Sequence, residues 1–147
     1  MTVKELATTC VRLAVIFAVV CGLIFPLVIT GIAQITMPYQ ANGEIVNING
    51  KPVGSELIAQ SFTSPLFFHP RNNSASGVDP DITLSSAYAQ VPRINNSTHI
   101  PIASLKAIIK DNIRWTYWIA GTPYVNVLRL NILLMEKYPQ VYSAFLA

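Results

Sequence analysis

Asp79 and Asp81 are the acidic side chains of this sequence that stand close enough together to suggest an acid/base pair. Paired carboxylates of this kind carry out glycoside hydrolysis when a cleft holds them at the right separation. Here they flank Pro80 and lead into Ile82-Thr83, a pattern that is more typical of a turn followed by a helix cap. We therefore expect turn and cap roles for both aspartates before any catalytic role.

Other catalytic signatures are missing from the sequence. His69 and His99 are far apart, and Cys10 and Cys21 stand at or inside an apolar segment, so no metal-ligand spacing occurs. The sequence has no GxxxxGK[ST] loop, no HExxH, no GxSxG and no Asp-Lys-Thr-Gly of the kind that a phosphorylated pump needs. We predict no catalytic residue, no metal site and no cofactor in this chain.

A long apolar segment dominates the N-terminal part. Asp, Glu, Lys and Arg are absent from Leu13 through Gly43, and the part from Leu13 to Met37 is almost wholly apolar. As a helix it would be roughly 37 Å long, enough to cross a hydrocarbon core of about 30 Å. A cleaved signal peptide is the alternative, but its apolar region is about 7–15 residues long. We predict one uncleaved transmembrane helix over residues 13–37.

Polar and small residues interrupt this segment at helical spacing. Pro26, Thr30 and Gln34 are four residues apart and share one helix face, with Gly31 beside them. Such residues are costly against lipid and usually face another helix. We predict that this face packs against a partner in the membrane, although Thr and Gly are also tolerated toward lipid.

The flanking charges indicate an orientation. Lys4 and Arg12 precede the segment, whereas the first cation after it is Lys51. The positive-inside tendency then places residues 1–12 in the cytoplasm and residues 38–147 outside, so the chain would be a single-pass protein of the cell membrane in contact with lipid. The outer part has nearly balanced charges and no basic run, which argues against a nucleic-acid partner.

The outer part has the pattern of one small α/β (α+β) domain. Asn49-Gly50 predicts a hairpin between strands at 44–48 and 51–54, and 57–62 could add another extended piece. Residues 61–78 have loop composition, and their two phenylalanines, Phe67 and Phe68, need cover from the domain core or from a neighbour.

Three helices are expected after this loop. The first would start in 79–83 and end or bend at Pro92, with a break at 95–98. The second would begin at Pro101 and carry a cationic row, Lys106, Lys110 and Arg114, most simply a solvated face. The third is expected over 124–138.

Several segments together resemble the C subunit of the Kdp-type potassium-transporting ATPase. The matching segments, in the order in which that family has them, are Phe25-Pro26-Leu27 with Thr30 and Gln34, Ala41-Asn42-Gly43, Gly54 to Phe62, Phe68-His69-Pro70-Arg71, Ser76 to Thr83 with Ala87, Gln90, Pro92 and Arg93, and Gly121 to Val127 with Leu130-Asn131. Two departures stand out. Only residues 72–75 separate the fourth and fifth segments, where family members usually have a longer insertion, and Leu84 stands where proline is common.

The resemblance implies a non-catalytic accessory subunit of a high-affinity, ATP-driven potassium importer, aiding assembly and acting as a catalytic chaperone that raises the ATP affinity of the pump subunit. Its implied partners are a P-type pump subunit, a channel-like potassium-selecting subunit and a small single-helix subunit. ATP, Mg²⁺ and potassium would bind to those other subunits. The motif residues that it marks for a modulatory or structural role are Asp79, Asp81, Gln90, Arg93 and Asn126.

A membrane-anchored module that binds a ligand outside the cell is the alternative function. In that hypothesis the aromatic residues 67, 68, 115, 117 and 118 would line the site.

Overall fold

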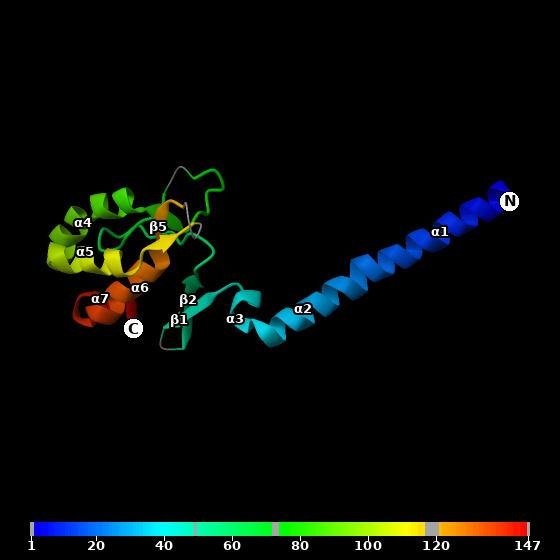
Figure 1. Cartoon of the computed structure of the whole chain (residues 1–147). Coiled ribbons are helices and arrows are strands. Elements are labelled where there is room, and N and C mark those ends of the chain that lie inside the picture. Colours follow the sequence, from blue (N-terminus) through cyan, green and yellow to red (C-terminus); the bar gives the residue numbers. More distant parts are fainter. Residues whose placement is uncertain (1, 49, 72–73, 117–120, 147) are drawn as a thin grey trace. The chain divides into compact units, whose positions relative to one another are not determined.

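The computed structural model describes residues 2–48, 50–71, 74–116 and 121–146 and divides the chain into two units, Met1–Asn42 and Gly43–Ala147. The first unit is helical, and the second is a mixed helix and sheet domain (Figure 1). This confirms the predicted fold class, an α+β domain that follows one long apolar helix.

The first unit is built on the helical stretch Val3–Thr36, which is long and apolar enough to cross a membrane. It consists of α1 (Val3–Val19), a π-helical turn η1 (Val20–Ile24) and α2 (Phe25–Thr36). A capping box starts it: the Glu5 N–H donates to Thr2 Oγ1, and the Thr2 N–H donates to Glu5 Oε2. The helix therefore extends the predicted span, residues 13–37, back to Val3 and ends at Thr36.

Pro26 explains the π-helical turn. A proline inside a helix cannot donate a hydrogen bond, and its ring crowds the carbonyl group four residues before it. Just ahead of it, the Phe25 N–H reaches back five residues to the Val20 carbonyl group instead of four. After Thr36 the chain turns at Met37 into one short helical turn, α3 (Pro38–Ala41).

The second unit begins with the predicted hairpin. Strands β1 (Ile45–Ile48) and β2 (Lys51–Ser55) pair antiparallel, with a bulge between Val46 and Asn47. Gly50 has a φ of 77°, the left-handed conformation that this turn requires. Residues 57–62 form no strand, and the described residues of 61–78 contain neither helix nor strand, so the predicted loop is confirmed there.

A three-stranded antiparallel sheet lies at the centre of the domain. Its strands are β3 (Asp81–Thr83), β4 (Arg114–Trp115) and β5 (Pro123–Asn126), in the spatial order β3-β5-β4. The sequence interpretation missed β3, at one edge of this sheet, and β5, at its centre. The helix start expected within 79–83 is confirmed, because Thr83 caps a helix that begins at Leu84, but the strand Asp81–Thr83 before it was missed. Residues 124–126 were wrongly assigned to a helix. Each of these strands is too short to show an alternating pattern.

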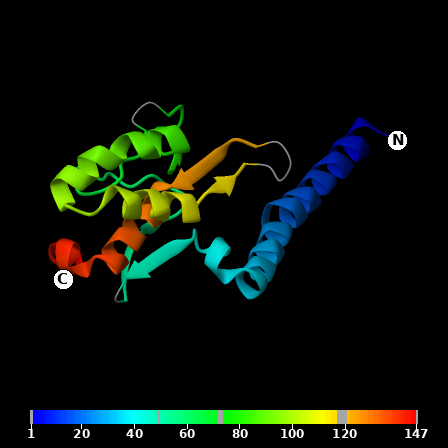
Figure 2. The same ribbon diagram turned by 60° about the vertical axis from the view of Figure 1, so that its left-hand side comes forward.

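Helices α4 (Leu84–Thr98) and α5 (Ile102–Asp111) lie side by side (Figures 1 and 2). Thr83 caps α4, since its Oγ1 accepts from the Ser86 N–H. Pro92 lies inside this helix and does not end it, and the predicted break at 95–98 was wrong, because α4 continues to Thr98. It ends at His99, whose φ of 59° is the left-handed cap conformation.

Helices α6 (Val127–Lys137) and α7 (Pro139–Leu146) complete the core. Asn126 caps α6 by accepting from the Arg129 N–H. The fully buried Asn131 side chain bonds to both backbone groups of Phe68, accepting from its N–H at 2.8 Å and donating to its carbonyl oxygen at 2.9 Å. These two hydrogen bonds hold the loop around Phe68 against α6.

Candidate functional site

The five motif residues of the domain fall into two separate hydrogen-bonded clusters rather than one site. Gln90 and Arg93 belong to the first, which we call the loop clamp, and Asp79, Asp81 and Asn126 belong to the second, which we call the sheet-end cluster. The sequence alone does not reveal this division.

The loop clamp joins α4 to the segment 64–69. The Arg93 guanidinium donates to the Pro65 carbonyl oxygen at 2.7 Å, the Phe67 carbonyl oxygen at 2.9 Å and Gln90 Oε1 at 2.9 Å. The same Gln90 side chain bonds to both backbone groups of His69, accepting from its N–H at 2.8 Å and donating to its carbonyl oxygen at 3.1 Å.

His69 closes the loop clamp. Its Nε2 lies 2.8 Å from the Ser64 carbonyl oxygen, so this nitrogen carries a proton and donates. Partial burial lowers the pKa of Arg93 from its ordinary value. Because these side chains hold backbone groups, the arrangement is suited to fixing a loop and lacks a free nucleophile or base.

The sheet-end cluster ties β3, β5 and the residue after β2 together. Asn126 Nδ2 donates to Asp81 Oδ1 at 3.0 Å and to the Glu56 carbonyl oxygen at 2.9 Å. The Glu56 carboxylate pairs with Arg114 at 3.0 Å and with Arg129 at 3.6 Å. Asn126 thus links three segments that are distant in sequence.

The two aspartates differ in role. Asp79 Oδ1 accepts from the Asp81 N–H at 3.0 Å, the bond of an Asx turn, which is the turn role expected for it. Burial raises the pKa of Asp81 above its ordinary value, with the hydrogen bond from Asn126 opposing this and the nearby Asp79 adding to it. Of the two residues expected to cap the helix, Asp81 or Thr83, it is Thr83 that caps α4, whereas Asp81 lies in strand β3.

Both aspartates line a shallow pocket of about 330 Å³ together with Arg71, Thr83 and Tyr124. A carboxylate pair beside an arginine could bind a small polar group, but no base, nucleophile and oxyanion donor converge on it. Among the residues that the structure describes, no group of three or more His, Cys, Asp or Glu side chains could hold a metal ion.

The predicted partner-packing face lies on α2. Pro26, Thr30, Gly31 and Gln34 are all exposed, and a methyl group added at Gly31 would meet no atom within 4 Å. The Gln34 side-chain amide forms two hydrogen bonds of 3.2 Å with the Asn42 amide, and Asn42 Nδ2 also donates to the Pro38 carbonyl oxygen. Gln34 thus holds the end of α2 to the turn that follows it.

The described aromatic residues suggested for a ligand site, Phe67, Phe68 and Trp115, differ in exposure. Phe67 and Phe68 are buried in the core, at 3% and 0% exposure. Trp115 is 62% exposed, and residues 117 and 118 lie outside the described part of the chain. Core cover, the first of the two explanations for the phenylalanine pair, is therefore confirmed.

The predicted cationic row was wrong in one member. Lys106 and Lys110 are exposed on α5, but the helix ends at Asp111, and Arg114 belongs to β4 and pairs with Glu56. Glu56 and His69 received no role from the sequence. The ion-pair partners of Glu56, Arg114 and Arg129, are distant in sequence, so no local spacing could have indicated them. The partner of the His69 ring is a backbone carbonyl group, that of Ser64, which no motif of side chains reveals.

The chain matches one family model, described as "K+-transporting ATPase, c chain", over residues 7–74 and 72–136. Curated relatives named "Potassium-transporting ATPase KdpC subunit" include one from Caldanaerobacter subterraneus subsp. tengcongensis, 31% identical over 86% of this chain and 93% of its own length. Others come from Acidobacterium capsulatum, at 32% over 88% of this chain and 97% of the relative, and from Bacillus cereus, at 30% over 90% and 96%.

The two matched segments meet at residues 72–74, where the sequence was expected to lack an insertion. The alignment with the first of these relatives covers 179 positions, more than the 147 residues of this chain, so that relative carries residues absent here. The match spans the long helix and most of the domain.

Proposed function

The chain belongs to the KdpC family, the c chains of K+-transporting ATPases, and on this basis we propose that it is a non-catalytic accessory subunit of an ATP-driven potassium import system. The observation that carries the non-catalytic part is the use of the motif side chains. Gln90, Arg93 and Asn126 bond to backbone groups of their own chain, and Asp81 is bound by Asn126. Side chains committed in this way stabilise a fold and leave the chemistry to other subunits.

The proposed partners are a P-type pump subunit that hydrolyses ATP, a channel-like subunit that selects potassium and a small single-helix subunit. The names of the relatives support membership of such an ATPase. ATP, Mg²⁺ and potassium would bind to those subunits and not to this one.

The long helix is the element that we propose for docking in the membrane, as a retained anchor with its N-terminus in the cytoplasm. Lys4 and Arg12 before the apolar stretch support that orientation. Thr30 and Gly31 are exposed on α2 and would let a neighbouring helix approach closely.

The same topology limits how this subunit could modulate the pump subunit. A domain outside the membrane cannot contact ATP on the inside, so any rise in the ATP affinity of the pump subunit would pass through the helix as a coupling between two sites. The chaperone role would then be conformational and not a direct contact with the nucleotide.

The test replaces Thr30 and Gln34 together with leucine and measures recovery of the pump and channel-like subunits after mild detergent extraction. We expect recovery to fall about eightfold, because a polar contact between membrane helices contributes on average about 0.6 kcal/mol, or about 1.2 kcal/mol for the two replaced side chains. ATP dependence of the remaining complex should shift to higher ATP concentrations.

Val28 and Ile32 on the opposite face, changed together to leucine, form the matched control and should leave recovery unchanged. Unchanged recovery with the Thr30/Gln34 variant would refute docking by this face. Recovery of the chain without any ATPase subunit, before any substitution, would refute the accessory function itself.

A further inference from the structure

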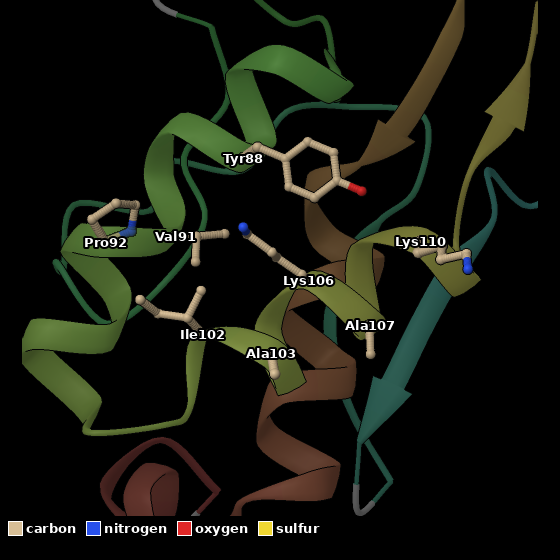
Figure 3. Close-up of a pocket in the computed structure, with 8 residues that line it drawn as sticks. All are labelled: Tyr88, Val91, Pro92, Ile102, Ala103, Lys106, Ala107 and Lys110. Carbon is tan, nitrogen blue, oxygen red and sulfur yellow. The ribbon is translucent and has the colours of Figure 1, made fainter.

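An open groove runs over the exposed side of the α4–α5 pair and belongs to neither hydrogen-bonded cluster. Its volume is about 670 Å³, within the range of about 300–1,000 Å³ that is usual for small-molecule sites. The lining comes from two helices (Figure 3): Tyr88, Val91, Pro92, Ile102, Ala103, Lys106, Ala107 and Lys110.

Small side chains open this groove. Ala103 and Ala107 are four residues apart and so lie on the same face of α5, and Pro92 lines the groove from α4. Val91, only 1% exposed, forms part of the floor, and Ile102, 43% exposed, stands at one end. The result is an apolar surface wide enough to cover an aliphatic chain.

Among the described residues, the only charged side chains that line the groove are lysines. Lys106 and Lys110 contribute ammonium groups and Tyr88 a hydroxyl group, and no acidic side chain lines the groove. Figure 3 shows the Lys106 side chain extending from α5 toward Val91 on α4, whereas Lys110 points away from α4. A cation therefore lies beside an apolar floor, and the groove itself supplies no counter-charge.

We propose that this groove binds a single-chain amphiphile with an anionic head, its aliphatic chain along Val91, Ala103 and Ala107 and its head at the Lys106 ammonium group. From Lys106 to either end of the groove, Ile102 or Lys110, the helix rises about 6 Å, so the groove would hold the part of an acyl chain that lies next to the head. The apolar helix of the same chain keeps the domain near lipid, which can supply fatty carboxylates and single-chain phosphates.

An acidic helix from a partner protein is the competing occupant, and the geometry disfavours it. A helix with its side chains is about 10–12 Å wide and brings its own side chains to the contact, whereas a single aliphatic chain needs far less room between the two helices. It would also have to displace the Lys106 side chain, which crosses the space between the two helices.

The experiment uses the full chain in nanodiscs of phosphatidylcholine, which supplies no anionic lipid. Three photoreactive probes share one twelve-carbon tail and carry a carboxylate, a phosphate or a neutral methyl ester head, and labelled peptides are mapped by mass spectrometry. We expect both anionic probes to label residues 88–92 and 102–107 about fivefold more than the neutral probe, the effect of one partly exposed ion pair. The stronger of the two anionic arms identifies the source as a fatty acid or a single-chain phospholipid.

Variants of the groove make the test specific. Lys106→Met should lower labelling about fivefold, whereas Lys106→Arg should retain it. Ala103→Leu with Ala107→Leu should fill the groove and abolish labelling there, and both positions are exposed, so the fold should tolerate them. The matched control is Lys137→Met, an exposed lysine at the end of α6, which should change nothing.

Four results would overturn the proposal. The first is equal labelling of the groove by the neutral probe, and the second is labelling confined to Val3–Thr36. The third is labelling of the groove that is unchanged in Lys106→Met. The fourth is labelling that is lost once the chain is part of the purified ATPase complex, which would mean that a partner protein covers the groove. Because the nanodisc measurement needs no partner, the proposed accessory function can fail without affecting it.

Discussion

Arg93 shows how one side chain can hold a loop. Its guanidinium group donates to two carbonyl oxygens of the segment 64–69 and to Gln90 Oε1, which itself accepts from the His69 N–H. Lysine offers a point charge and cannot reproduce this fork of donors. The family resemblance marked Arg93 as a motif residue, and the geometry gives it a structural task.

The prediction for this residue is that Arg93→Met lowers the free energy of unfolding by about 1–2 kcal/mol. Two carbonyl groups and the Gln90 amide lose a charged donor, while partial exposure lets water replace part of it. Chemical denaturation of the chain measures this. The exposed Arg71, changed to methionine, is the control and should shift stability by less than about 0.5 kcal/mol. Equal effects of the two changes would contradict the clamp.

Tyr142 makes the stability of the domain sensitive to alkali. Its side chain is fully buried against Phe67, its hydroxyl group donates to the Leu66 carbonyl oxygen at 2.9 Å, and burial raises its pKa to about 12. The folded state therefore holds this proton more tightly than the unfolded state, whose pKa is near 10. The stabilisation is complete below pH 10 and is lost as the pH rises toward and through 12.

Tyr142→Phe should accordingly be less stable than the parent chain at pH 8, by about 1 kcal/mol, with the difference shrinking above pH 10. Unfolding curves recorded between pH 8 and 11 check this. Phe67→Leu, which removes packing but no titrating group, should instead cost the same stability at every pH. A constant difference for Tyr142→Phe would show that its ionisation is not linked to folding.

At the scale of elements, the sequence predicted those helices and strands whose signal lies within a few neighbouring residues. The Asn49-Gly50 dipeptide correctly predicted the hairpin β1–β2, and the apolar segment predicted the long helix. Strands β3 and β5 were missed because three or four residues give no periodicity. Their pairing also joins Asp81 to Asn126, and helices α4 and α5 lie between these two residues in the sequence. The same distance hid the bonds of Asn126 to Asp81 and Glu56.

The predicted break in α4 at residues 95–98 was wrong for a different reason. Residues 95–98 are polar and suggested a break, yet Thr98 is buried and donates to the Ile94 carbonyl oxygen at 2.7 Å. Asn95 donates to the Ile100 carbonyl oxygen and so holds the chain after the helix. Tertiary packing thus overrode the low helix propensity of these residues.

Pro26 permits a prediction about the long helix. Pro26→Ala restores an N–H group and removes the ring, which relieves a local cost of up to about 3 kcal/mol. We expect Val20–Ile24 to become regular α-helix. The backbone amide chemical shifts of these residues should change, and their protection from hydrogen exchange should increase. Pro38→Ala, outside the helix, is the control and should leave this turn as it is. A π-helical turn that persists without the proline would mean that Gly22 or packing causes it.

The whole molecule consists of two units, each with its own organisation. The domain from Gly43 onward has a continuous buried core, and Val46 and Ile48 of the hairpin pack against it. Its first residue is also held by the domain, since Ser55 Oγ donates to the Gly43 carbonyl oxygen at 2.6 Å. Nothing in this core requires the long helix.

We therefore predict that a fragment of residues 43–147 is soluble without detergent and unfolds cooperatively, with a free energy of roughly 5–15 kcal/mol. Calorimetry and circular dichroism measure this. A fragment of residues 56–147 lacks the hairpin and its packing and should be clearly less stable. A fragment 43–147 that shows no cooperative transition would mean that the helix or a partner is needed for folding.

The π-helical turn Val20–Ile24 also changes the rotational phase of the long helix. One wide turn holds one residue more than an α-helical turn, and one residue corresponds to about 100° of rotation. Every side chain of α1 is therefore turned by that angle from where an uninterrupted helical wheel drawn from α2 would place it. The face that continues Pro26, Thr30 and Gln34 toward the N-terminus must be counted with that offset. A helical wheel drawn without it would assign the wrong α1 residues to a neighbouring helix.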